Sequence, residues 1–219
     1  MSADDRFPDR REAGRLLGEA LTKLELDNPV VLALPRGGVP VGYEVAKKLG
    51  VPLDVLLVRK IGAPGHEEYG IGALVDGASP QVVIDEKAAR MVGADKAYID
   101  QTVARELAEL ERRRAAYCTH PPMQLAGRVV VVVDDGIATG GTVRAALKGL
   151  GQAGAQRVVL AVPVAPADIL RELKSLCDDV VCLAAPAPFY AVGAHYRDFG
   201  QTTDDEVIRL LGEQRQRAP

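Results

Sequence analysis

Five consecutive valines, at positions 129–133, are the clearest feature of the hydrophobic pattern along this chain. An apolar run without polar alternation is typical of a strand buried on both faces, as in a parallel sheet covered by helices. Similar runs predict further core strands at 30–34, 53–58, 157–163 and 179–183.

Apolar residues recur at helical spacing between these runs, which predicts helices at about 10–26, 39–49, 143–151, 167–176 and 203–214. A longer helical pattern covers 86–117, with a break near Gly93. Ile99, Val103, Leu107 and Leu110 form its buried stripe. Three arginines, Arg112 to Arg114, end this helix; we favour a solvated face there over an anion site.

Residues 61–72 contain five glycines or prolines and several charges, so we expect a mobile loop there. Short strands are expected near 73–75 and 81–84. An irregular segment rich in aromatic residues follows the last strand, at 186–201.

Strands that alternate with helices predict a doubly wound α/β fold, with a mainly parallel sheet and helices on both faces. We interpret residues 1–219 as a single domain, with a helical insertion at 86–118 and a C-terminal hood or wrap at 186–219. Ligands of such sheets bind at the carboxyl ends of the strands. If strands 30–34 and 129–133 are neighbours, the loops that follow them converge.

Composition narrows the functional classes. The 219 residues are 47% hydrophobic and 26% charged, as in ordinary globular proteins. A net charge of −3 without a basic cluster argues against nucleic acid as a partner. No apolar run approaches the ~20 residues that span a bilayer, and residues 1–11 do not resemble a signal peptide. Cys118, Cys177 and Cys182 show no metal-ligand spacing and suit a reducing compartment, so we expect a cytoplasmic protein.

The chemistry-bearing stretch follows the valine strand. Asp134 and Asp135 can accept hydrogen bonds from vicinal hydroxyls or hold a metal through water. The backbone N–H groups of the next loop and the helix start attract phosphate. This loop consists of Ala138, Thr139, Gly140, Gly141 and Thr142. An ordinary strand–turn–helix junction of a Rossmann-like domain is the alternative, whereas a Walker A loop is excluded because no Lys-Ser/Thr follows the glycines.

A second loop of the same kind follows strand 30–34. Arg36, Gly37 and Gly38 combine backbone donors with a guanidinium, a combination that suits a pyrophosphate. A plain tight turn is the alternative at this position.

The stretch 129–142 resembles the signature of type I phosphoribosyltransferases, and its Ala-Thr-Gly-Gly-Thr ending is most similar to adenine phosphoribosyltransferases. The resemblance implies binding of 5-phosphoribosyl 1-pyrophosphate (PRPP) with Mg²⁺, and transfer of ribosyl phosphate to a nitrogenous base with release of pyrophosphate. Asp134 and Asp135 would hold the ribose hydroxyls and, through water, the metal. Residues 138–142 would hold the 5′-phosphate.

The resemblance extends to the first half of the chain. It implies a pyrophosphate site made of Arg36, Gly37, Gly38, Arg59 and Lys60. It also implies a non-proline cis peptide at Pro35-Arg36 or Arg36-Gly37. Glu68, in the sequence Glu-Tyr-Gly, corresponds to a candidate proton donor on a loop that closes over the site, although an exposed acid is an equally good interpretation.

The acceptor is expected to be a purine such as adenine, because Ala138 lacks the carboxylate that relatives acting on 6-oxopurines carry. Candidate base-binding residues are Ile137, Phe189, Tyr190 and Tyr196, although the aromatic segment could equally be a wrap that packs on the core. PRPP and a base are the expected partners, with a homodimer as a candidate assembly. A non-catalytic sensor of PRPP or nucleotide on the same fold is the alternative function, and an unrelated nucleotide-binding domain is a third.

Overall fold

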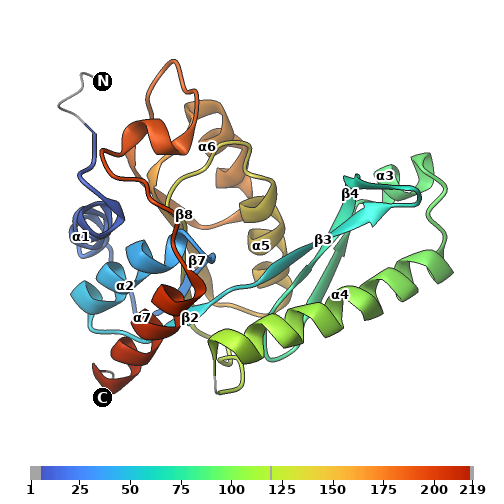
Figure 1. Ribbon diagram of the computed structural model, residues 1–219, viewed down its shortest axis with the longest axis horizontal. Helices are drawn as coiled ribbons and strands as arrows, with labels where there is room; N and C mark the ends of the chain where they lie inside the picture. The colour runs from blue at the N-terminus through green and yellow to red at the C-terminus, as the bar shows by residue number, and fades with distance from the viewer. Residues whose placement is uncertain (1–5, 119, 218–219) are drawn as a thin grey trace.

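The valine strand β6 (Val129–Val133) lies at the centre of a five-stranded parallel sheet (Figure 1). In this computed structural model, residues 6–118 and 120–217 are described, except for the side chain of Glu68. The strand order is β2-β1-β6-β7-β8, and each neighbouring pair is parallel. The other strands are β1 (Val30–Ala33), β2 (Leu53–Val55), β7 (Arg157–Val164) and β8 (Asp179–Ala184).

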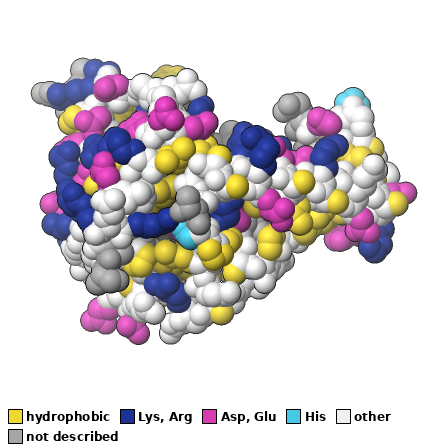
Figure 2. Space-filling view, turned by 60° about the horizontal axis from the view of Figure 1, so that its bottom comes forward, with side chains coloured by type: hydrophobic (Ala, Val, Ile, Leu, Met, Phe, Trp, Pro, Cys, Tyr) yellow, Lys and Arg dark blue, Asp and Glu magenta, His cyan; other side chains and the backbone are white. Residues whose placement is uncertain are grey.

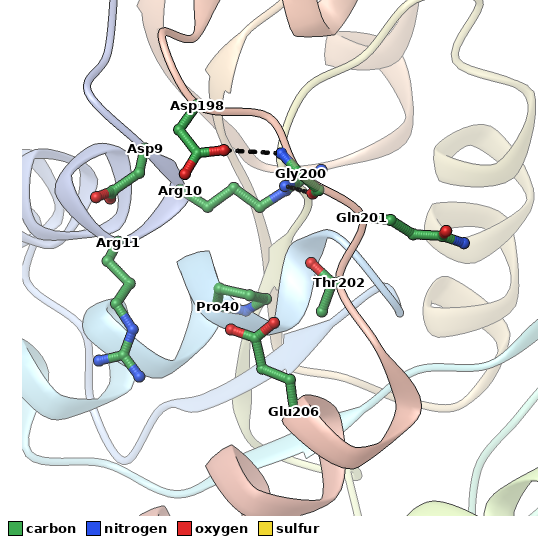
Figure 3. A pocket seen from close by; sticks show the side chains of 9 residues that line it. All are labelled: Asp9, Arg10, Arg11, Pro40, Asp198, Gly200, Gln201, Thr202 and Glu206. Carbon is green, nitrogen blue, oxygen red and sulfur yellow. Dashed lines mark hydrogen bonds between the residues drawn. The ribbon is translucent and has the colours of Figure 1, made fainter.

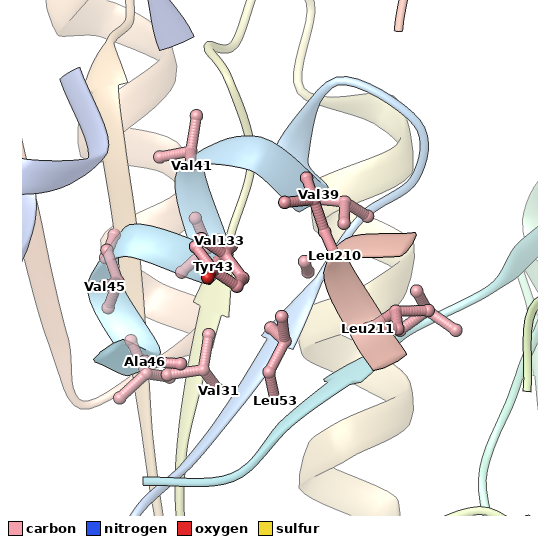
Figure 4. Packing of buried hydrophobic residues seen from close by; sticks show 14 of the residues in the cluster. Val31, Val39, Val41, Tyr43, Val45, Ala46, Leu53, Val133, Leu210 and Leu211 are labelled. Atoms are coloured by element: carbon pink, nitrogen blue, oxygen red, sulfur yellow. The ribbon is translucent and has the colours of Figure 1, made fainter. Parts of the chain in front are cut away.

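Helices cover both faces of this sheet, as the alternating pattern predicted. Val129, Val131 and Val133 pack in one apolar cluster with α1 (Arg10–Leu21), α2 (Gly38–Leu49) and α7 (Asp204–Arg217) (Figure 4). Val130 and Val132 pack in a second cluster, on α5 (Gly141–Gln152) and α6 (Ala167–Leu173). Because side chains alternate along a strand, five consecutive valines supply both clusters. The doubly wound α/β prediction is confirmed.

The prediction of a mobile loop at 61–72 was wrong. The expected strand 53–58 ends early, at Val55, and residues 61–72 belong to the antiparallel pair β3 (Val58–Ala63) and β4 (His66–Val75). A third strand, β5 (Gln81–Ile84), completes this separate sheet. Pro64 and Gly65 form the turn of the hairpin, a role that suits both residue types. The same glycines and prolines that suggested a loop therefore shape a hairpin.

The long helical pattern is confirmed as α3 (Glu86–Met91) and α4 (Lys96–Tyr117), separated near Gly93. Ile99 and Val103 of α4 pack beneath the hairpin against Ile61 and Ile71. The three strands and α4 form an arm that projects from the central sheet (Figure 1). Among the described residues, no helix is both long and apolar enough to cross a bilayer.

Arg114 corrects the interpretation of the arginine run. Arg112 and Arg113 are exposed, as expected, and they pair with Glu109. Arg114 is only 7% exposed, and its guanidinium donates to the carboxylates of Asp54 in β2 and Asp76 after β4. Burial raises the pKa of Asp76, against the opposing effect of Arg114. This buried ionic cluster joins the arm to the central sheet.

Two 3₁₀ turns complete the described elements, η1 (Lys174–Leu176) and η2 (Val192–His195). η2 belongs to the predicted C-terminal wrap. The backbone N–H of Phe7 donates to the carbonyl of His195, and that of Arg197 donates to the carbonyl of Phe7. The N-terminal end of the described chain is thus bonded to the wrap beside the central sheet.

We expect Arg114→Ala to lower the free energy of unfolding by about 3–5 kcal/mol, because it leaves two buried carboxylates without their counter-charge. Chemical denaturation measures this change. Arg113→Ala, which removes an exposed arginine from the same helix end, is the matched control and should cost less than about 1 kcal/mol. Equal effects of the two variants would contradict a structural role for the buried cluster.

Candidate active site

The two phosphate-type loops converge because β1 and β6 are adjacent and parallel. The backbone N–H of Leu34, just after β1, donates to the carbonyl of Val133 at the end of β6, at 2.9 Å. A Cβ added to Gly37 would lie 2.0 Å from Oδ2 of Asp135. Only a residue without a side chain allows this approach. The convergence predicted from sequence is therefore confirmed.

The first loop carries a cation beside a helix start. The peptide bond between Pro35 and Arg36 is cis, as the resemblance implied, and Gly38 begins α2. Arg36 lines a cavity of about 350 Å³ together with Arg112 and Arg113 of α4. Its guanidinium lies 3.8 Å from a carboxylate oxygen of Asp204. Arg112 and Arg113 are already paired with Glu109, so Arg36 is the cation that this loop offers to an anion.

The acidic pair lies at the end of β6 and is largely enclosed. Oδ1 of Asp134 accepts the backbone N–H of Asp135 at 2.9 Å. Burial, together with the neighbouring charge of Asp135, raises the pKa of Asp134 well above its ordinary range. Burial also raises the pKa of Asp135, whereas Arg10 lowers it. Mg²⁺ prefers carboxylate oxygens as ligands and usually keeps several of its water molecules. The acidic pair therefore fits a Mg²⁺ ion that is held through water.

Arg10, which sequence reasoning missed, neutralises this pair. Its Nε donates to Oδ2 of Asp135 at 2.8 Å, and its Nη1 donates to the carbonyl of Gly200 at 2.6 Å. The guanidinium carbon lies 3.8 Å from the ring centre of Phe199. Figure 3 shows Arg10 reaching from α1 toward Gly200, at a cavity of about 270 Å³. No local pattern could reveal a contact across 125 positions.

The predicted 5′-phosphate loop leads into α5, whose N-cap is Gly140. Gly140 is buried, and its four loop neighbours Ala138, Thr139, Gly141 and Thr142 are exposed. Within the described residues, no hydrogen bond engages the backbone N–H groups of this loop. Unpaired N–H groups at a helix N-terminus form a favourable environment for phosphate.

Arg59 and Lys60 do not share a site, although the resemblance implied that both bind the pyrophosphate. They are consecutive residues of β3, so their side chains leave opposite faces of the strand. Arg59 donates twice to Oε2 of Glu106 in α4, from Nε at 2.9 Å and from Nη2 at 2.8 Å. Lys60 instead lines a cavity of about 300 Å³ with Thr142 of the phosphate loop and with Arg144 and Lys148 of α5. Lys60 therefore lies beside the predicted 5′-phosphate loop and does not line the cavity of Arg36, and Arg59 is paired with Glu106.

Glu68, the candidate proton donor, belongs to β4, and its side chain lies outside the described part of the structure. His66, at the start of the same strand, is exposed. Glu68 is therefore a position on a hairpin and not on a free loop.

Two of the four candidate base-binding residues have no free face. Tyr196 is 2% exposed, packs on Phe7 and Phe199, and donates its hydroxyl to the carbonyl of Asp135 at 2.5 Å. Ile137 is also 2% exposed and lies in the core beneath α5. Burial of both side chains leaves no face for a base, so the expected role of Tyr196 and Ile137 was wrong.

The other two base-binding candidates lie in the outer part of the wrap. Phe189 is half-buried and stacks on His195 with ring centres 5.1 Å apart, and Tyr190 is 84% exposed. Gly136 brings this wrap close, because a Cβ there would lie 2.5 Å from Cγ1 of Val192. A side chain at this position would therefore displace the wrap.

Comparison with known proteins agrees with this geometry. Residues 9–196 match the family described as "Phosphoribosyl transferase domain". The chain belongs to this family. Its solved relatives include the protein TT1426 from Thermus thermophilus, whose crystal structure has 47% sequence identity and a TM-score of 0.82, with 95% of this chain and 99% of that chain covered.

Two curated relatives of this phosphoribosyl transferase domain come from Mycobacterium tuberculosis, strains CDC 1551 and H37Rv. Each is 47% identical over 206 residues and is provisionally named as a phosphoribosyl transferase. The match covers 94% of this chain and 46% of each relative, so the chain spans about half the length of the curated relatives it matches.

Gly37→Ala should lower the melting temperature of this phosphoribosyl transferase domain. The added methyl group collides with a carboxylate that Arg10 holds in place, and such overpacking costs about 1–3 kcal/mol. For a chain of this length, each 1 kcal/mol corresponds to about 2–4 °C. Gly151→Ala, in α5 with no neighbouring atom within 4 Å, is the matched control and should leave the melting temperature unchanged or higher.

Asp134→Asn should stabilise the free protein at neutral pH. The pKa of Asp134 in the folded state lies above its ordinary value of 3.8, so the folded state keeps this proton up to a higher pH than the unfolded state does. Stability therefore falls as pH rises between the two values and stays lower above them. We expect Asn to raise the melting temperature by about 2–4 °C at pH 7 and hardly at pH 3, the shift that ~1 kcal/mol produces.

Melting curves of wild type and variant across pH measure this effect. The exposed Asp100→Asn serves as the control and should change the melting temperature by less than about 1 °C at either pH. A lower melting temperature for Asp134→Asn at pH 7 would show that ionised Asp134 stabilises the fold.

Proposed function

We propose that this chain is a phosphoribosyltransferase that binds PRPP with Mg²⁺ and transfers ribosyl phosphate to a nitrogen atom of a base, with release of pyrophosphate. The observation that supports this proposal is the convergence of two phosphate-type loops on one acidic pair. Family membership adds support, because the family description names transfer of a phosphoribosyl group.

Different residues bind different parts of PRPP. The loop of residues 138–142 holds the 5′-phosphate through its unpaired N–H groups. Asp134 and Asp135 accept hydrogen bonds from the ribose hydroxyls. Arg36 and the start of α2 bind the pyrophosphate. Lys60 lies beside the 5′-phosphate loop, where its charge would favour the anionic substrate. Mg²⁺, held by the acidic pair through water, would neutralise charge on the leaving pyrophosphate.

Positioning and charge stabilisation account for the catalysis in this proposal. The bond between ribose C1 and the pyrophosphate oxygen breaks, the electron pair leaves with the pyrophosphate, and a nitrogen lone pair of the base forms the new bond to C1. Cations on the pyrophosphate side favour the leaving group, and the acidic pair stabilises the positive charge that develops on the ribose.

The acceptor we propose is a purine such as adenine. Ala138 presents no carboxylate to the site, which disfavours bases that need a proton handled at the 6-oxo position. Tyr190, whose ring is exposed, and Phe189 are the candidates for stacking on the base. Within the described chain all three cysteines are free thiols, which supports the reducing cytoplasm as the place of action. A homodimer is the assembly we propose to test.

A sensor that binds PRPP or a nucleotide without turnover is the second candidate. One observation favours it: residues 61–72 form a hairpin packed on α4, where the enzyme interpretation expected a loop that closes over the site and excludes water. Such a protein keeps the sugar-phosphate site and uses it for regulation.

Asp135→Asn should weaken PRPP binding by at least tens-fold, because it removes a charged acceptor from the sugar site and breaks the pair with Arg10. Calorimetric titration with PRPP and Mg²⁺ measures binding, and pyrophosphate release with a panel of bases measures turnover. Asp100→Asn is the matched control and should bind as the wild type does. Tight binding without turnover on any base would favour the sensor, and unchanged affinity of Asp135→Asn would overturn the assignment of the sugar site.

A further inference from the structure

A group of potential metal ligands lies away from the acidic pair, where the arm meets the central sheet. One ligand atom each from Asp54, Cys118 and His120 lie within 4.8 Å of one another. None of these residues has a role in the proposed transfer reaction. Carboxylate, thiolate and imidazole together form a ligand set typical of Zn²⁺.

The fold brings these ligands together from two segments. Asp54 lies in β2, at an edge of the central sheet. Cys118 follows the last residue of α4 and has an extended backbone, with φ −130° and ψ 130°. His120 is only two positions further along the chain, so the segment that leaves α4 supplies both of the other ligands.

The interatomic distances are close to those of a tetrahedral site. Sγ of Cys118 lies 3.5 Å from Oδ1 of Asp54, and Nε2 of His120 lies 4.0 Å from the same oxygen. Bonds of about 2.3 Å to sulfur and about 2.0 Å to oxygen or nitrogen place tetrahedral ligands roughly 3.3–3.5 Å apart. The cysteine and aspartate are therefore already at the required separation, and the histidine needs a small side-chain rotation.

Hydrogen bonds already orient two of the ligands. Nδ1 of His120 lies 2.7 Å from the carbonyl of Pro121, so it carries the proton and leaves the lone pair on Nε2. Oδ2 of Asp54 accepts Nη2 of Arg114 at 2.6 Å, and Oδ1 accepts the backbone N–H of Val55 at 2.8 Å. Such outer partners fix the direction of ligands in known metal sites.

The local charge favours a dication. Asp54 and Asp76 carry two negative charges against the single positive charge of Arg114, and all three are buried. A thiolate at Cys118 would add one more negative charge. A divalent cation then brings the buried cluster to neutrality, whereas a monovalent ion does not.

The site opens onto a cavity that can supply the remaining position. Cys118 and His120 line a cavity of about 600 Å³, together with Asp76 and Arg114. Cys118 itself is 5% exposed, and the side chain of His120 is 26% exposed. Figure 2 shows hydrophobic side chains gathered near the centre of one face of the molecule. A metal bound here has three protein ligands and a fourth position facing water.

We propose that Asp54, Cys118 and His120 bind one Zn²⁺ that ties the end of α4 to β2, with a water as the fourth ligand. The thiol loses its proton to solvent as the zinc–sulfur bond forms, so one proton is released for each metal bound. The site is independent of the proposed transferase activity.

Co²⁺ serves as the probe, because a thiolate ligand gives it a charge-transfer absorption in the near ultraviolet. The full chain, treated with chelator and kept reduced, is titrated with Co²⁺ and then with Zn²⁺. We expect saturation at one equivalent, the thiolate band, and displacement of Co²⁺ by Zn²⁺. Cys118→Ser should abolish the band, and His120→Ala should weaken Co²⁺ binding at least about tenfold.

Two control variants test whether Co²⁺ binds at this site or at another cysteine or histidine. Cys182→Ser removes a thiol from β8, and His66→Ala removes an exposed histidine from the hairpin; both should bind Co²⁺ as the wild type does. Binding without a thiolate band would place the metal on carboxylates elsewhere and overturn the proposal. A band that survives Cys118→Ser, or no uptake at all, would overturn it too. Should Cys118→Ser fail to fold, the wild-type band together with His120→Ala decides, since His120 is partly exposed.

Discussion

The parallel hydrogen bonding of β1 to β6 is the constraint on which the candidate active site depends. It brings the end of each strand to the same edge, where the loop after Leu34 meets the loop after Val133. Both strands are buried on two faces, and their side chains pack alternately in the two apolar clusters. The separation of the two loops is therefore set by the hydrogen-bonded register of two buried strands.

Buried charges organise the rest of the structure. Asp134 and Asp135 are compensated by Arg10, which arrives from α1, and Asp54 and Asp76 are compensated by Arg114, which arrives from α4. The first group belongs to the sugar site, and the second joins the arm to the sheet. In both groups the arginine comes from a distant segment of the chain. The ion pairs therefore form only when the tertiary fold is complete.

The fold class could be predicted because its signal is local: uninterrupted apolar runs alternate with helical patterns. The two loops and the acidic pair could be predicted for the same reason. The hairpin could not, because glycines and prolines in 61–72 weaken the strand pattern while Ile61 and Ile71 are buried by α4. Arg59 and Lys60 were treated as one cationic site, although strand geometry sends them to opposite faces. Arg10, Arg114 and Tyr196 act through contacts that join distant parts of the chain, which no window of sequence contains.

Because Arg10 pairs with Asp135, residues 129–142 do not form a complete site by themselves. The counter-charge comes from the first helix, and Gly200 and Phe199, which hold that guanidinium, come from the wrap near the other end. Grafted alone into another α/β scaffold, residues 129–142 would carry two crowded carboxylates with nothing to neutralise them. A designer who wants this sugar site must transplant both ends of the chain along with the strand.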